Sequence, residues 1–305
     1  LQPEWFYQYM LSPQSIRPNT VMPSFWPGGK AIRQDLMDGT TQGQISGLWK
    51  YLQRGRQAPT PRGLQVEPIE LLANRGEAVM LRRSYPNIGK RGIGVGYPAG
   101  INLAYDAEQM RLALMWRGGF ADPGGVWRGQ GHGRVRPLSS DVWSLQVGPD
   151  LEQDGKAWLV DDGRPPDHQF TGYFLDAQQR PTFTYRYLGI EVKDYFIDQS
   201  GPDSQSELER QSNVNKRSIT DQSVTLDRWL SLNSNRKISG LRFRVASGKD
   251  IRELGKNAFQ IDQRLRVVIP EDLKVEINDR NDLTDLHVRF DADAGETKLE
   301  VKYVW

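Results

Sequence analysis

The chain has 305 residues, 10% of them aromatic, which is enough to bury a large core in more than one packing unit. Its formal net charge of +2 argues against a strong general affinity for nucleic acid or for an anionic membrane. The sequence has no cysteine, which excludes disulfides, thiolate zinc sites, thiol nucleophiles and covalent attachment of haem within this chain.

The first 56 residues predict a small helical segment. Pro3 suits the first position of a helix that ends before Pro13. A second helix is predicted over 41–52, where Thr41 and Gln44 form a capping-box pattern. Apolar residues at i, i+3, i+4 and i+7 give this helix one apolar face: Ile45, Leu48, Trp49 and Leu52.

Between the two predicted helices, residues 17–27 read RPNTVMPSFWP. Pro18 and Pro23 restrict the backbone on either side of Met22, which suits a side chain held at a fixed distance from a metal. The order of helix, RPxTxMP loop, turn and final helix ending in WKYL resembles the C-terminal half of a c-type cytochrome domain. More narrowly, it is similar to the cytochrome segment of the large haem-binding proteins of planctomycete-type bacteria.

This resemblance implies that Met22 is the distal ligand of a haem iron, a role that suits a soft thioether. It also implies that four aromatic residues pack against the macrocycle: Trp5, Phe25, Trp26 and Trp49. Such domains attach haem through CxxCH, so haem c would be supplied by a cytochrome half or subunit outside this chain. The competing interpretation is that Met22 fills an apolar gap.

Residues 57–65 predict an exposed linker, and from residue 66 onward the periodicity changes to short alternating runs. We expect 66–305 to form a large antiparallel β-sandwich, as one domain or two subdomains, interrupted by a polar loop over 200–223. Strands are predicted at these segments: 78–82, 94–97, 101–105, 111–116, 170–175, 182–187, 190–196, 224–230, 240–245, 264–269, 286–290 and 298–305.

The resemblance to the planctomycete-type proteins continues into this region. Residues 92–120, 127–131 and 172–185 are similar to segments that follow the cytochrome unit in those proteins.

No apolar run reaches the roughly 18 residues that span a bilayer, so we predict no transmembrane segment. Since the chain begins at Leu1 without a signal-like stretch, we expect a processed or excised piece of a longer protein. The resemblance implies that this protein is bacterial and is exported or periplasmic.

A second candidate site is the glycine-rich loop over 127–137. Four of its side chains could bind an anion or a sugar: Trp127, Arg128, His132 and Arg134. A solvated basic loop is the competing interpretation. The run GIGVGYP at 92–98 lacks the spacing of a phosphate loop, and tight β turns are expected there.

Metal chemistry has little support in the sequence. The three histidines show no metal-ligand spacing, so no zinc or copper site is predicted. Three aspartates could act as paired acids or calcium ligands, or could lie in ordinary turns: Asp161, Asp162 and Asp176.

Three function classes fit these observations. The leading hypothesis is electron transfer with a redox partner, through a haem that Met22 ligates. The second is a carbohydrate-binding or structural sandwich with an inert cytochrome remnant, suggested by nine tryptophans and eleven tyrosines. The third is a sugar-active enzyme of mutarotase-like or lyase-like architecture that uses His132 and Arg134. Four tryptophans are nevertheless expected in the core: Trp116, Trp143, Trp158 and Trp229.

Overall fold

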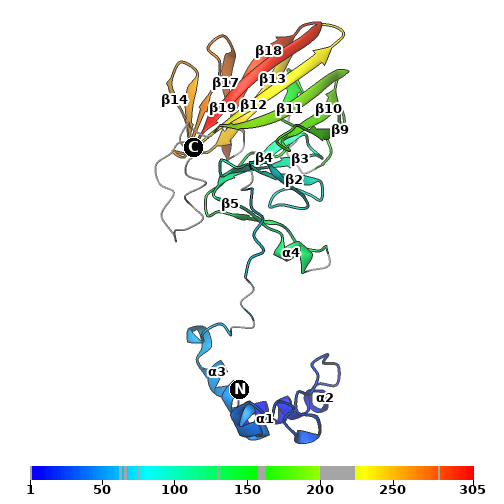
Figure 1. Cartoon of the computed structure of the whole chain (residues 1–305), viewed down its shortest axis with the longest axis vertical. Coiled ribbons are helices and arrows are strands. Elements are labelled where there is room, and N and C mark those ends of the chain that lie inside the picture. Colours follow the sequence, from blue (N-terminus) through cyan, green and yellow to red (C-terminus); the bar gives the residue numbers. More distant parts are fainter. Residues whose placement is uncertain are drawn as a thin grey trace. The chain divides into compact units, whose positions relative to one another are not determined.

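The computed structural model describes residues 2–61, 64, 67–73, 76–128, 131–156, 163–199, 224–280 and 282–305. The chain forms two compact units, Leu1–Glu67 and Pro68–Trp305, which are treated separately below (Figure 1). The predicted loop over 200–223, Trp158 and the acidic pair at 161–162 lie outside the described residues. Among the described residues, no helix is both long enough and apolar enough to span a membrane.

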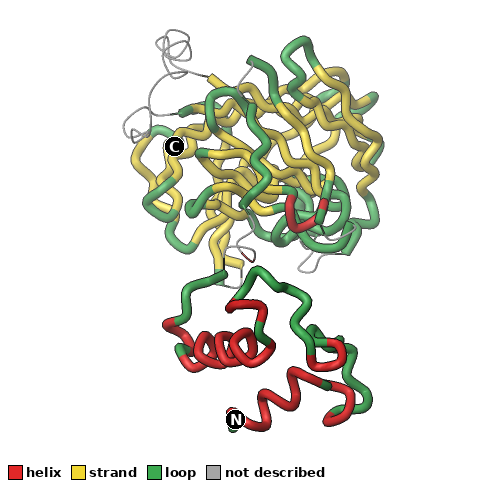
Figure 2. The backbone as a smooth tube through the Cα atoms, turned by 60° about the horizontal axis from the view of Figure 1, so that its bottom comes forward, coloured by secondary structure: helices red, strands yellow, loops and turns green. Residues whose placement is uncertain are grey.

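The first unit is helical (Figure 2). Its elements are α1 (Pro3–Leu11), α2 (Pro13–Ile16), η1 (Pro27–Gly29), η2 (Met37–Gly39), α3 (Thr41–Gln53) and η3 (Gly55–Gln57), where η marks a 3₁₀ turn. Helix α1 begins and ends where the prolines predicted. Its exposed side stacks Trp5 on Tyr9, with ring centroids 5.0 Å apart.

The predicted capping box at Thr41 is wrong by one residue. The N-cap of α3 is Thr40, whose backbone is extended and whose hydroxyl accepts a hydrogen bond from the Gly43 amide at 3.2 Å. Thr41 lies inside the helix and donates its hydroxyl to the Gly29 carbonyl at 2.8 Å. The Gln44 side chain does not fold back on the helix terminus but reaches to the preceding segment, as described below.

The core of the helical unit is small. Five residues are fully buried in it: Phe6, Met10, Trp26, Ala31 and Ile45. Trp49 packs beside Phe6, with ring centroids 5.2 Å apart. The other two residues of the predicted apolar face of α3, Leu48 and Leu52, are 41% and 53% exposed. The periodicity therefore predicted an apolar face of α3 that this unit buries only in part.

The second unit is built of β-strands, as predicted. The strands are β1 (Val79–Arg82), β2 (Gly92–Gly96), β3 (Ile101–Asp106), β4 (Arg111–Arg117), β5 (Gly119–Asp122), β6 (Arg136–Leu138), β7 (Val142–Ser144), β8 (Leu151–Gln153), β9 (His168–Leu175), β10 (Pro181–Tyr187), β11 (Ile190–Gln199), β12 (Thr225–Ser234), β13 (Ile238–Gly248), β14 (Ile251–Gly255), β15 (Ala258–Ile261), β16 (Leu265–Val268), β17 (Lys274–Arg280), β18 (Leu283–Ala292) and β19 (Gly295–Val304). One short helix, α4 (Gly124–Trp127), follows β5.

These strands form four sheets, with the orders β1-β2-β3-β4-β7, β14-β15-β16-β19-β12-β11-β10-β9, β17-β18-β13-β8 and β5-β6. Between described residues, every strand pair that the sheets contain is antiparallel, for example β11 with β12. The three larger sheets share one hydrophobic core, which includes Leu103 of β3, Leu230 of β12 and Val288 of β18. The predicted antiparallel, sandwich-like character of this region is confirmed.

Gly92, Gly94 and Gly96 of GIGVGYP do not lie in tight turns but in the fully buried strand β2, which overlaps the strand predicted over 94–97. A Cβ atom at Gly94 would overlap the Tyr85 hydroxyl, and one at Gly96 would lie 2.5 Å from Cγ of Phe120. The glycines make room for these two aromatic rings, which belong to a second core cluster together with the fully buried Trp116.

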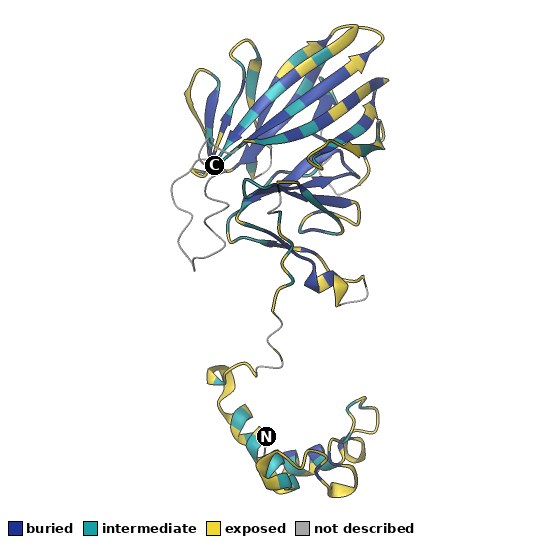
Figure 3. Cartoon of the chain, viewed as in Figure 1, coloured by how far each residue is buried: buried dark blue, intermediate teal, exposed yellow. Residues whose placement is uncertain are grey.

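Burial divides the predicted core tryptophans (Figure 3). Trp116 and Trp143 are buried, as expected. Trp229 is only half-buried, so the expectation that it belongs to the core is wrong. The reason is strand alternation: Arg228 and Leu230 of β12 point inward, and Trp229 between them points outward.

Candidate functional site

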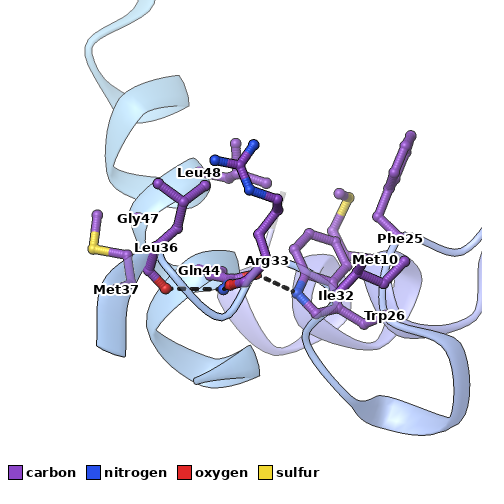
Figure 4. Close-up of a pocket in the computed structure, with 10 residues that line it drawn as sticks. All are labelled: Met10, Phe25, Trp26, Ile32, Arg33, Leu36, Met37, Gln44, Gly47 and Leu48. Atoms are coloured by element: carbon purple, nitrogen blue, oxygen red, sulfur yellow. Dashed lines mark hydrogen bonds between the residues drawn. The ribbon is translucent and has the colours of Figure 1, made fainter. Parts of the chain in front are cut away.

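The helical unit contains a hollow with a volume of about 570 Å³ (Figure 4). Most of its lining is apolar, and the only charged group is the guanidinium of Arg33. The hollow is lined by Met10, Phe25, Trp26, Ile32, Arg33, Leu36, Met37, Gln44, Gly47 and Leu48.

One amide side chain holds the wall of this hollow together. Gln44 of α3 accepts a hydrogen bond from the Trp26 indole at 3.0 Å. Its Nε2 donates to the carbonyls of Arg33 at 2.6 Å and Leu36 at 2.9 Å. Figure 4 shows Gln44 between Trp26 and Leu36, so this amide, together with the hydrogen bond from Thr41 to Gly29, fixes the irregular segment over 26–36 against α3.

The loop that precedes the hollow is tied to α1. The hydroxyl of Ser24 donates to the Leu11 carbonyl at 2.7 Å and accepts from the Trp26 amide at 3.3 Å. Met22 is half-buried and packs against the core cluster to which Trp26 belongs. Its amide donates to the Thr20 hydroxyl at 3.2 Å, while the neighbouring Val21 is 99% exposed.

The structure brings together only part of the predicted cofactor-binding set. Phe25 and Trp26 line the hollow. Met22 and Trp49 instead pack against the core cluster, and Trp5 lies on the exposed side of α1. Five further apolar residues that line the hollow were not predicted from the sequence: Met10, Ile32, Leu36, Met37 and Leu48. Only Leu48 carried a signal, because it belongs to the periodic apolar face of α3.

Paired charges lie beside this hollow. Arg33 donates to both carboxylate oxygens of Asp35, at 2.7 and 2.5 Å. The hydrogen bond from Arg33 lowers the pKa of Asp35 to about 2, so the carboxylate stays charged at neutral pH. The positive charge of Arg33 is thus matched beside an otherwise apolar lining.

The glycine-rich loop of the β unit presents its predicted residues to solvent. Trp127 is 49% exposed, and Arg128, His132 and Arg134 are exposed as well. Beside this loop, Asp122 accepts hydrogen bonds from the Gly124 amide at 2.8 Å, the Ile69 amide at 3.0 Å and Arg136 at 3.1 Å. Asp122 thus anchors the backbone from which the loop leaves the sheet.

The two other histidines and Asp176 are buried or make contacts that hold the backbone in place. His168 and His287 are buried, and Nε2 of His168 lies 2.8 Å from the Leu151 carbonyl. Burial lowers the pKa of His168 to about 4. Asp176 accepts hydrogen bonds from the amides of Gln178 and Arg180 in the β9–β10 turn, in line with the turn interpretation. Across the described residues, no three acidic, histidine or cysteine side chains are grouped to hold a metal ion.

A network of buried charges in the β unit went unpredicted. The guanidinium of Arg228 donates to both carboxylate oxygens of Asp194, at 2.9 and 2.6 Å, and to Asp150 at 2.8 Å. Arg244 reaches the other oxygen of Asp150 at 3.3 Å. All four side chains are fully buried. The only sequence signal was that Arg228, Arg244 and Asp194 occupy inward-facing positions of otherwise apolar strands.

Comparison with known proteins does not identify the chain. No protein-family profile and no curated protein matches its sequence.

Proposed function

We propose that the helical unit is one half of a haem-binding domain that serves electron transfer. In this proposal, the chain covers one face of a c-type haem that a separate cytochrome half, with its own CxxCH motif, carries. The observation that supports it best is the open apolar hollow of about 570 Å³, which lies in the same unit as the Met22 loop. The absence of cysteine means that no haem is attached covalently to this chain.

The residues present fit one face of a large apolar cofactor. The volume of the hollow falls within the range of about 300–1,000 Å³ that is usual for small-molecule and cofactor sites. Aromatic and aliphatic side chains dominate its lining, and Phe25 and Leu48 are 53% and 41% exposed. A macrocycle seated there would remove these side chains from water.

Met22 is the proposed iron ligand. A bound haem would supply the one-electron chemistry, and a neutral thioether on its iron would raise its reduction potential. Met22 precedes Phe25 by three residues and shares a core cluster with Met10. Met10 and Met37, which line the hollow, are the competing thioether donors within this unit.

The proposal can be tested with the full chain and a haem peptide, cut from a c-type cytochrome, that retains the proximal histidine and leaves the sixth iron position open. Adding the chain should shift the Soret band and produce the methionine-to-iron charge-transfer band in the red. Met22→Ala should abolish the charge-transfer band, whereas the matched variants Met10→Leu and Met37→Leu should keep it.

Two results would count against the proposal. A wild-type chain that leaves the haem-peptide spectrum unchanged would reject haem binding by this unit. A charge-transfer band that survives in Met22→Ala but disappears in Met37→Leu or Met10→Leu would assign the ligand to the hollow-lining methionine instead.

A further inference from the structure

The outer face of the eight-stranded sheet carries an ordered set of polar and aromatic side chains. Strands β11, β12 and β19 lie side by side in this sheet, with β12 in the middle (Figure 1). Their inward residues, such as Val192, Leu230 and Leu299, are buried in the core. Most of their alternate residues face outward and are exposed or half-buried, which gives the banded pattern along these strands in Figure 3. Asp227 and Ser231 of β12 also face outward but are buried.

At one end of this face is a polar hollow of about 270 Å³. It is lined by Glu191, Lys193, Ser231, Asn233 and Glu296. These residues come from three neighbouring strands, because Asn233 of β12 pairs with Glu191 of β11 on one side and with Glu296 of β19 on the other.

The polar groups of the hollow are held in place and remain available. The Ser231 hydroxyl donates to Glu296 at 2.8 Å, and Lys298 forms an ion pair with Glu296 at 3.2 Å. The hydrogen bond from Ser231 and the nearby Lys298 lower the pKa of Glu296, so it is an ionised acceptor at neutral pH. Within the described part of the chain, the Asn233 side-chain amide makes no hydrogen bond to another residue.

Aromatic rings continue the same face beyond the hollow. Tyr195 and Trp229 are paired across β11 and β12, with ring centroids 6.4 Å apart and planes within 9° of parallel. The same row crosses the sheet to Thr182 of β10 and Phe174 of β9, and Phe174 is 52% exposed. A polar hollow and nearly parallel aromatic rings therefore share one surface.

This combination selects among ligand classes. Four acidic residues are interspersed with three basic ones on this face, so it has no large charge excess that would select a phosphate or a polycation. They are Glu191, Asp227, Glu296 and Glu300, and Lys193, Lys298 and Lys302. Strands β11 and β12 are paired on both sides, so a peptide cannot add to either of them as a further strand. Strand β19 pairs with β16 over 302–304, and its earlier described residues have no strand on that side, so a peptide could add only at this border and not on the face itself. The face has both features that bind a pyranose ring: an aromatic surface for the C–H face of the ring, and hydrogen-bond acceptors and donors for its hydroxyls.

We propose that this outer face of β11, β12 and β19 binds a neutral oligosaccharide. One sugar ring stacks on Trp229 and Tyr195, and hydroxyls of the next ring hydrogen-bond to Asn233 and Glu296 in the hollow. The site lies in the β unit and its assignment is independent of the haem proposal, because none of its residues belongs to the helical unit.

Affinity electrophoresis and calorimetry with the full chain test this assignment. The probes are soluble cellulose derivatives, xylan, glucomannan and mixed-linkage glucan in the gels, and the corresponding hexasaccharides in the calorimeter. At least one probe should bind, and Trp229→Ala should weaken its binding by about tenfold or more. Asn233→Ala should weaken binding to a smaller extent while leaving the fold intact, since this exposed side chain has no described hydrogen-bond partner.

The matched control is Ile277→Ala, which removes an exposed apolar side chain of β17, in another sheet of the same unit, and should bind as the wild type does. If no probe binds at millimolar concentration, the assignment is wrong. Binding that is unchanged in both Asn233→Ala and Trp229→Ala would also overturn it, because the saccharide would then occupy another surface. If Trp229→Ala fails to fold, the Asn233→Ala result decides alone.

Discussion

The two units of this chain bury their apolar side chains to different degrees. The β unit encloses a core so completely that charged side chains such as Arg228 and Arg244 are buried and paired inside it. The helical unit buries five residues in its core, while Phe25, Leu36 and Leu52 remain about half-exposed. The β unit thus completes its own core, whereas the helical unit keeps an apolar surface that water does not favour.

The contrast bears on function as well as stability. In the helical unit five exposed apolar residues line one hollow, where a cofactor face would complete the packing: Phe25, Ile32, Leu36, Met37 and Leu48. In the β unit polar and aromatic residues on the outer face of β11, β12 and β19 are arranged in register across strands, as a surface ligand would require. The same chain therefore offers one site defined by incomplete burial and another defined by strand register.

The largest effect on stability is expected for Arg228→Met in the β unit. Removing the guanidinium would leave Asp194 and Asp150 buried without its three hydrogen bonds, so we expect the free energy of unfolding to fall by about 3–5 kcal/mol. Chemical denaturation measures this change. The control is Arg186→Met, which removes an exposed ion pair to Glu191 and should change stability by about 0.5 kcal/mol or less. Equal effects of the two variants would mean that the buried network adds nothing.

In the helical unit, neighbouring apolar residues of α3 should differ strongly. Ile45→Ala empties a position that is 1% exposed and should reduce the opening free energy of α3 amides by about 2–4 kcal/mol in hydrogen exchange. Leu48→Ala, at 41% exposure, should reduce it by about 1 kcal/mol or less. Similar losses for both variants would show that Leu48 is already buried, which would contradict the incomplete burial of apolar side chains in the helical unit. Leu48→Ala should still weaken haem-peptide binding.

The smallest effect expected concerns pH. The folded-state pKa of His168, about 4, lies below its ordinary value of about 6.5, so between these values the unfolded chain binds more protons than the folded chain. The His168 contribution is therefore fully present above pH of about 6.5 and is lost as the pH falls towards about 4. It should amount to a few kcal/mol at most.

This contribution can be isolated with His168→Gln, which keeps a donor towards the Leu151 carbonyl. Denaturation of both proteins at pH values of about 7.5 and 4.5 gives the comparison, in which the wild type should lose more stability on acidification than the variant. Identical losses would show that His168 does not titrate with an altered pKa. The difference between the proteins cancels the opposing contribution of Glu152, whose pKa burial raises.

Local sequence patterns determined much of the architecture. The alternation of apolar and polar residues predicted long strands such as β11, β12 and β19, because one face of each is buried and the other is wet. Proline positions predicted the start and end of α1. Strands such as β14 and β17 were missed, because they are polar and largely exposed, so their residues show no buried face.

The candidate sites depended on contacts that local patterns do not contain. Met22 was conspicuous in the sequence, yet the residues that line the hollow include Met10, Met37 and Leu48 instead. Gln44 holds two further lining residues, Trp26 and Leu36, in place by hydrogen bonds. Trp229 was expected in the core because its context is apolar, and only the pairing of β12 with its neighbours places it outside beside Tyr195.

The sequence by itself therefore determined the main helices and the strongly alternating strands, and that no haem can be attached covalently to this chain. Only the tertiary structure decided which side chains meet, because the register between strands and the packing of irregular segments depend on residues far apart in the chain. Both candidate sites in this protein are formed by residues that lie far apart in the chain.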